Sequence, residues 1–151
     1  MRKFEIVRDE HRKYPEVEIM IPSRSSVRSC GYDFVVPVEV TLQPGEKKLI
    51  FSDVKAYMEA DEVLKIYPRS GLSTKKGIIL SNVVAIIDSD YAYADNDGNI
   101  GLSLWNTSNE VVVLEAGERV CQGIFVKYLT VDDEEEITKT RSGGFGSSGK
   151  H

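Results

Sequence analysis

The stretch "YDFVVPVEVTL" (32–42) decides the fold class. It is rich in valine and aromatic residues, which favour strands, and it shows no sustained helical period. Similar short apolar or alternating runs recur along the whole chain, at 4–7, 17–21, 46–52, 62–67, 77–87, 99–106, 110–116 and 119–129. This pattern predicts about eight to ten strands.

Turn signals separate these runs at Pro44-Gly45, Pro68, Asp97-Gly98, Ser108-Asn109 and Ala116-Gly117. Many short strands with short turns are typical of a barrel or a two-sheet jelly roll. One short helix is expected at 71–76. The predicted fold is therefore all-β, a jelly-roll-like β-barrel over residues 1–130.

Size and charge limit the possible functions. The chain has 151 residues and a net charge of −5, so we expect one domain without general affinity for nucleic acids or anionic membranes. The apolar runs are too short to span a bilayer, and the N-terminus lacks the apolar segment of a signal peptide. Cys30 and Cys121 are expected to be buried free thiols. These features predict a cytoplasmic protein.

The C-terminal residues combine an acidic run, "VDDEEEIT" (131–138), with "RSGGFGSSGKH" (141–151). The glycine-rich part could be a cloning remnant or a flexible arm that closes over an anion. A linker has no use for Phe145, whereas an aromatic ring can stack on a nucleobase. We therefore favour an acidic tether followed by a flexible arm, together covering residues 131–151.

Two segments could carry the chemistry. In "PRSG" (68–71), a guanidinium, a hydroxyl and unhindered N–H groups suit a phosphate, although the segment could be an ordinary turn capped by Ser70. Asp88 follows the apolar strand 77–87 and could act as a base for a water, or could simply bond its own backbone in a hairpin turn. The nearby "DNDG" (95–98) does not fit a calcium loop, because Tyr93 and Leu104 would occupy ligand positions.

A third segment, "EAGERVCQG" (115–123), is weaker on its own. Arg119 and Gln122 lie three residues apart on a predicted strand. This spacing predicts that the two side chains point to opposite faces, so that one could meet a ligand.

Five motifs now stand in order: "CGYDF" (30–34), "PRSG" (68–71), "NVVAIIDSDY" (82–91), "GERVCQ" (117–122) and "RSGGFGSSG" (141–149). In order and spacing they closely resemble the motifs of the trimeric dUTP pyrophosphatases, the dUTPases. The resemblance spans residues 30 to 149. It implies a jelly-roll homotrimer whose sites are each built from three chains, and which hydrolyses dUTP to dUMP and pyrophosphate.

The resemblance also implies residue roles. Asp88 would deprotonate a water for in-line attack on the α-phosphorus. The nucleoside would be held by Asn82, Ile87 and Tyr91, with Phe145 stacking on uracil. The phosphates would be held by Arg69, Ser70, Gly71 and Gln122, and by Arg141, Ser147 and Ser148 of the closing arm. Mg²⁺ would be held by the substrate phosphates, with Asp33 near its water shell.

Some positions depart from the family pattern. Ala85 replaces a usual glycine, and 92–99 forms a longer loop of a kind found in some bacterial and phage relatives. An alternative of the same fold is a dCTP deaminase. Another alternative adds a role seen in some phage-type dUTPases, in which the loop 92–99 would bind a repressor-type protein.

Overall fold

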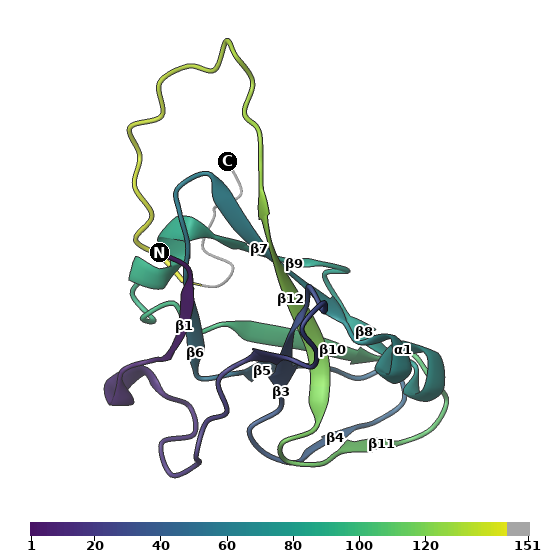
Figure 1. The fold of residues 1–151 in the computed structure, drawn as a ribbon. Coiled ribbons are helices and arrows are strands. Elements are labelled where there is room, and N and C mark those ends of the chain that lie inside the picture. Colours follow the sequence, from purple (N-terminus) through teal and green to yellow (C-terminus); the bar gives the residue numbers. More distant parts are fainter. Residues whose placement is uncertain (145–151) are drawn as a thin grey trace.

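The chain forms four small antiparallel sheets in a computed structural model that describes residues 1–144 (Figure 1). The largest sheet contains, in spatial order, β2 (Ser23–Arg24), β3 (Tyr32–Val35), β12 (Arg119–Lys127), β7 (Glu62–Pro68) and β9 (Ala85–Asp88). A second contains β5 (Lys47–Phe51), β10 (Gly101–Asn106) and β8 (Ile78–Leu80). Two strand pairs complete the fold: β1 (Lys3–Ile6) with β6 (Val54–Tyr57), and β11 (Val112–Leu114) with β4 (Val40–Leu42).

The helical elements are short. The expected helix is present as α1 (Ser70–Lys76), which ends at Gly77 in the left-handed conformation (φ 67°) and carries Lys75 and Lys76 in its last turn. Two 3₁₀ turns, η1 (Asp9–His11) and η2 (Ser89–Tyr93), lie in connecting segments. Within residues 1–144 no helix is long and apolar enough to cross a membrane.

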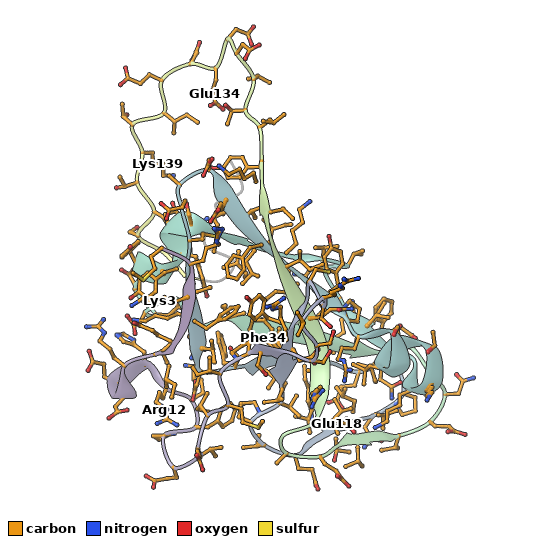
Figure 2. The ribbon with its side chains drawn as sticks, in the orientation of Figure 1. Lys3, Arg12, Phe34, Glu118, Glu134 and Lys139 are labelled. Atoms are coloured by element: carbon orange, nitrogen blue, oxygen red, sulfur yellow. The ribbon has the colours of Figure 1, made fainter. Side chains whose placement is uncertain are left out.

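The predicted all-β fold is confirmed. One core joins the four sheets, and its fully buried members include Phe34, Leu64, Ile66, Leu80 and Leu102. Figure 2 shows Phe34 among the packed side chains and Glu134 far out on the chain beyond β12. Across residues 1–144 the sheets surround this core as separate units, and none of them closes on itself as a single cylinder.

Several expected strands differ from those observed. The run 17–21 is a loop, in which the Arg12 guanidinium binds the carbonyl of Val17. The run 32–42 divides into β3 and β4 around Pro37, which has no N–H for a ladder. The run 77–87 divides into β8 and β9 around a tight turn at 81–84. Conversely, β2 and β6 were not expected, because their segments lack a run of β-branched residues.

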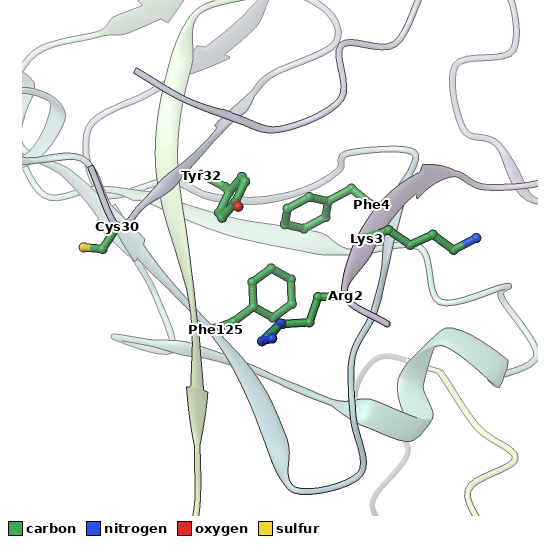
Figure 3. A pocket seen from close by; sticks show the side chains of 6 residues that line it. All are labelled: Arg2, Lys3, Phe4, Cys30, Tyr32 and Phe125. Atoms are coloured by element: carbon green, nitrogen blue, oxygen red, sulfur yellow. The ribbon is translucent and has the colours of Figure 1, made fainter. Parts of the chain in front are cut away.

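The thiol prediction is half right. Cys121 is buried, and burial raises the pKa of its thiol, whereas Cys30 is exposed. Cys30 borders a cavity of about 480 Å³ beside the aromatic rings of Phe4, Tyr32 and Phe125 (Figure 3). The Phe4 ring lies 5.3 Å from Phe125 and 5.4 Å from Tyr32, centroid to centroid, so β1 is fastened to β3 and β12 by aromatic packing.

A buried polar network holds the N-terminal segment against the loop 92–99. Asp97 has a side chain only 9% exposed, and its carboxylate binds Lys55 Nζ at 3.0 Å and Arg8 Nε at 3.2 Å. The Arg8 backbone N–H donates to the same carboxylate at 2.8 Å. Asp53, fully buried, accepts the backbone N–H groups of Lys13 and Tyr14 at 2.8 Å.

The charge of Asp97 should make stability depend on pH. Burial alone raises the pKa of this carboxyl, but the Arg8 N–H and the Lys55 ammonium lower it more, and the net direction is downward. A lowered pKa means that the stabilisation is present above about pH 4 and is lost as the pH falls through the folded-state pKa. We expect Asp97→Asn to cost about 3 kcal/mol of unfolding free energy at pH 7, since Lys55 is left buried without its partner.

Urea denaturation at pH 7, 5, 4 and 3 measures this effect. The difference between the wild type and Asp97→Asn should shrink below pH 4. The control is Asp61→Asn, because Asp61 pairs with Lys127 at 2.7 Å on the surface, where the pair contributes little. A constant difference at every pH would contradict the assignment.

Candidate active site

The phosphate-binding candidates lie where β7 leads into α1. Arg69 is the N-cap residue with an extended backbone (φ −69°, ψ 143°), and its carbonyl accepts the N–H groups of Leu72 and Ser73. Within residues 1–144 the Ser70 hydroxyl makes no hydrogen bond, so it does not cap the helix. A Cβ added to Gly71 would meet nothing within 4 Å. The turn therefore presents an open face to any bound group.

Asp33 on β3 forms ion pairs with two arginines beside this turn. Its carboxylate lies 3.3 Å from Arg69 Nε and 3.4 Å from Arg119 Nη1, and its side chain is 12% exposed. Gln122 lies opposite Asp33 across the β3–β12 ladder, so these two side chains share a face. A register shift between Arg119 and Cys121 brings Arg119 to the same side. The expectation that Arg119 and Gln122 point to opposite faces was therefore wrong, because the bulge adds a residue to β12.

The two arginines border a cavity of about 420 Å³ with a cationic lining. Arg69, Lys75, Lys76 and Arg119 line it together with Ser70, Gly71, Leu72 and Glu118. Lys76 Nζ is paired with Glu118 Oε1 at 2.9 Å. The remaining cations, with the hydroxyl and the open backbone of the turn, suit an anion with several phosphate groups.

The nucleoside-binding candidates lie on the turn between β8 and β9 and on β9 itself. Asn82 is exposed at the turn, whereas Ile87 is buried in the sheet. Val83 adopts φ +67°, and the Val84 N–H donates to the Asn82 carbonyl at 2.7 Å across it. A β-branched residue in the left-handed region is strained, and such strain is common at binding sites.

Asp88 ends β9, and its side chain is 53% exposed. Arg141 Nη2 lies 2.6 Å from Asp88 Oδ2, and Arg141 Nε lies 2.8 Å from Asp90 Oδ1. The guanidinium also lies over the Tyr91 ring, 6.0 Å from its centroid. In this structure the arginine expected at a phosphate therefore bridges the two aspartates.

Tyr91 belongs to η2 and is buried, with 5% of its surface exposed. Its hydroxyl donates to the Asn99 carbonyl at 2.7 Å and accepts from Asn96 Nδ2 at 2.8 Å. Burial raises the pKa of this phenol, with Asn96 and Arg141 opposing it, so the hydroxyl stays protonated and fixed near neutral pH. The two hydrogen bonds fix the orientation of the Tyr91 ring, and Arg141 contacts both this ring and Asp88.

The two groups of candidates stand at opposite ends of β7. Asp88 lies opposite Val63 at one end, and Arg69 follows Pro68 at the other. A strand rises about 3.3 Å per residue, so positions 63 to 69 span about 20 Å. The chain thus brings Asp33, Arg69, Ser70, Gly71 and Gln122 together, and separately brings Asp88, Tyr91 and Arg141 together. Phe145, Ser147 and Ser148 lie outside the described residues.

Comparison with known proteins gives the same family over nearly the whole length. The dUTPase family model matches residues 17–149. The chain belongs to the dUTPase family. The Lactococcus lactis subsp. lactis deoxyuridine 5'-triphosphate nucleotidohydrolase is 46% identical over 151 residues, covering 99% of this chain and 98% of the relative. The family predicted from the five motifs is thereby confirmed.

Solved dUTPases share the fold. The Streptococcus mutans dUTPase superposes with a TM-score of 0.75 at 37% identity, covering 86% of this chain and 98% of that one. A dUTPase mutant from phage phi11 of S. aureus, solved to show the coordination of a structural Mg(II) ion, superposes with a TM-score of 0.70. It is 19% identical, covers 92% of this chain and 97% of that chain, and supports the fold alone.

Two residues of this dUTPase family member, Asp90 and Asn96, were not picked out from the sequence, and a third, Arg119, was considered only as a weak candidate. Asp90 shares Arg141 with Asp88. Arg119 joins Arg69 on Asp33 through the bulge, which no spacing rule reveals. Asn96 holds the Tyr91 hydroxyl from within the loop 92–99. A sequence signal existed for Asp90 and Arg119, since they stand inside the third and fourth motifs, but none existed for Asn96.

Proposed function

We propose that this chain hydrolyses dUTP to dUMP and pyrophosphate, with Mg²⁺, at sites shared between the copies of a homotrimer. One observation supports a site shared between copies. Asp88 and Arg69 lie about 20 Å apart along β7, which is too far for both to reach the α-phosphate of one nucleotide. A complete site therefore needs the Asp88 end of one copy against the Arg69 end of another, as a ring-closing oligomer provides.

Asp88 is proposed as the general base. Its carboxylate would take a proton from a water, whose oxygen attacks the α-phosphorus while the bond to the β-bridging oxygen breaks and pyrophosphate leaves. In this structure Arg141 Nη2 donates to this carboxylate at 2.6 Å. The negative charges of a triphosphate would compete for that guanidinium, so substrate binding would free the base.

Arg69, Ser70, Gly71 and Gln122 are proposed to hold the phosphates. Asp33 keeps the Arg69 and Arg119 guanidinium groups close together, which orients them toward the cavity of about 420 Å³. Preorganised cations stabilise the charge that develops in phosphoryl transfer.

The donor set fits a Mg²⁺ bound mainly through the substrate. Within the described residues no cluster of three or more His, Cys, Asp or Glu side chains could form a protein cage. Mg²⁺ is commonly held by one or two carboxylates plus substrate phosphates and waters. Asp33 would contribute through a water, and the ion would neutralise phosphate charge.

The nucleoside is proposed to lie along the turn and β9. Tyr91 would pack under the deoxyribose and exclude a ribose 2′-hydroxyl. The backbone from Asn82 to Ile87 would read uracil, and its fixed turn at Val83 leaves little freedom to admit a 5-methyl group. We further propose that residues 131–151 act as tether and lid, with Phe145 on uracil and with Arg141, Ser147 and Ser148 on the γ-phosphate.

Pyrophosphate release from dUTP, dTTP, dCTP and UTP, with and without Mg²⁺, tests this function. We expect turnover of dUTP alone, lost when EDTA removes the metal. Ammonia release from dCTP would instead indicate a deaminase. A repressor-type partner at the loop 92–99 is not part of this proposal, because no contact in the described residues points to one.

A further inference from the structure

We propose that Asn96 is a positioning residue that locks Tyr91 and at the same time seats the C-terminal arm, residues 131–144 as described. The loop 92–99 would then be a working part of the active site rather than a surface extension. This inference rests on the proposed function, in which Tyr91 forms the sugar wall and the arm closes the site.

Each end of the Asn96 amide has a defined partner. Nδ2 donates to the Tyr91 hydroxyl at 2.8 Å, and Oδ1 accepts the Gly98 N–H at 3.1 Å. The Tyr91 hydroxyl donates its one hydrogen to the Asn99 carbonyl at 2.7 Å. It can therefore only accept a hydrogen bond from residue 96. The site therefore requires a donor at Nδ2, which an aspartate cannot supply.

The same side chain contacts the arm. A Cβ added to Gly144 would lie 2.9 Å from Asn96 Cγ and 3.0 Å from Nδ2, so the glycine backbone rests directly on the amide. The Asp95 N–H donates to the Ser142 carbonyl at 3.0 Å, and Arg141 binds Asp88 and Asp90. Three arm residues, Arg141, Ser142 and Gly144, thus contact η2 and the loop, with Asn96 between Tyr91 and Gly144.

The loop 92–99 is held rigidly enough to position the arm. Asp97 is fixed by Lys55 and Arg8, and Gly98 (φ 69°) packs so closely that an added Cβ would lie 2.7 Å from Ala92 Cα. Because Asp97 and Gly98, the two residues that follow Asn96, are held in place, the position of Asn96 is defined by the fold. A shift of Asn96 would therefore move the sugar wall and the arm together.

The substitution Asn96→Ala tests whether Asn96 holds the arm in place. In the nucleotide-free protein we expect trypsin to cut after Arg141 about three- to tenfold faster, relative to cutting after the exposed Lys139, because one hydrogen-bonded contact is lost. With dUTP we expect KM to rise by a similar factor, with a smaller change in kcat, and discrimination against UTP to fall. The matched control is Asn109→Ala on an exposed turn, which should change none of these.

A double-mutant cycle with Gly144→Ala tests the contact itself. In the wild-type background the new methyl group meets Asn96 and should speed cleavage after Arg141. In the Asn96→Ala background that space is empty, so Gly144→Ala should add little. Strictly additive effects would show that the two residues do not touch and would overturn the proposal.

Asn96→Asp provides a second variant of nearly the same size in case Asn96→Ala unfolds. It keeps the acceptor for Gly98 but loses the donor to Tyr91, so KM for dUTP should still rise. Cleavage after Arg141 is measured without nucleotide and does not depend on the reaction. Absence of dUTP turnover in the wild type would overturn the proposed function, whereas normal turnover with unchanged cleavage and KM in Asn96→Ala would overturn this inference alone.

Discussion

Asp88→Asn should lower kcat for dUTP by about 10²- to 10⁴-fold, the range attributed to a positioned general base. An amide has the shape of the carboxylate but cannot accept the proton of the attacking water. The substitution should leave the fold intact, because the Asp88 side chain is 53% exposed and its partner Arg141 lies on the surface arm. The expected loss is therefore chemical and not structural.

The measurement is kcat and KM for dUTP, with the melting temperature of each variant. Asp132→Asn, an exposed acidic change in the tether, is the control and should keep full activity. KM should change little in Asp88→Asn, since its role is in the reaction step. Retention of more than a tenth of wild-type kcat would rule Asp88 out as the base.

Two inactive variants should restore one another when refolded together. Arg69→Ala removes a guanidinium from the phosphate site and should cost about 10²- to 10³-fold in kcat. Asp88→Asn removes the base at the far end of β7. If each site takes Asp88 from one copy and Arg69 from another, an equal mixture will contain some sites in which both residues are intact.

The size of the recovery follows from random assembly. Half of the copies carry an intact Asp88 and half carry an intact Arg69, so about one quarter of the sites should be complete. The mixture should then show about one quarter of wild-type activity. A site contained in one chain would recover no activity at all, and that result would disprove the shared site. Each variant refolded alone serves as the control.

The sequence predicted local structure well where backbone chemistry is specific. Gly45, Gly98 and Gly117 all have positive φ at turns expected from their dipeptides, and α1 begins within one residue of the expected start. The broad β class followed from the recurrent valine and isoleucine runs. These features depend on neighbours in the chain, so they can be inferred without the fold.

Features that depend on distant contacts were not predictable. The run 17–21 has strand-like residues, yet Arg12 draws its backbone into a loop. The bulge in β12 reverses the expected side of Arg119. The separation of Asp88 from Arg69 appears only once β7 is seen to pair with β9 at one end and to lead into α1 at the other. Motif order shows which residues matter without showing which of them meet in one copy.

The contact between the N-terminal segment and the loop 92–99 bears on how far the protein can be shortened. The family model begins at residue 17, whereas β1 and Arg8, which clamps Asp97, lie before it. A shortened protein starting at residue 17 would keep every motif and still lose the strand pair β1–β6 and the contact between Arg8 and Asp97. We therefore expect a protein trimmed to the region matched by the family model to be less stable than the whole chain, because it loses contacts that hold the loop 92–99 in place.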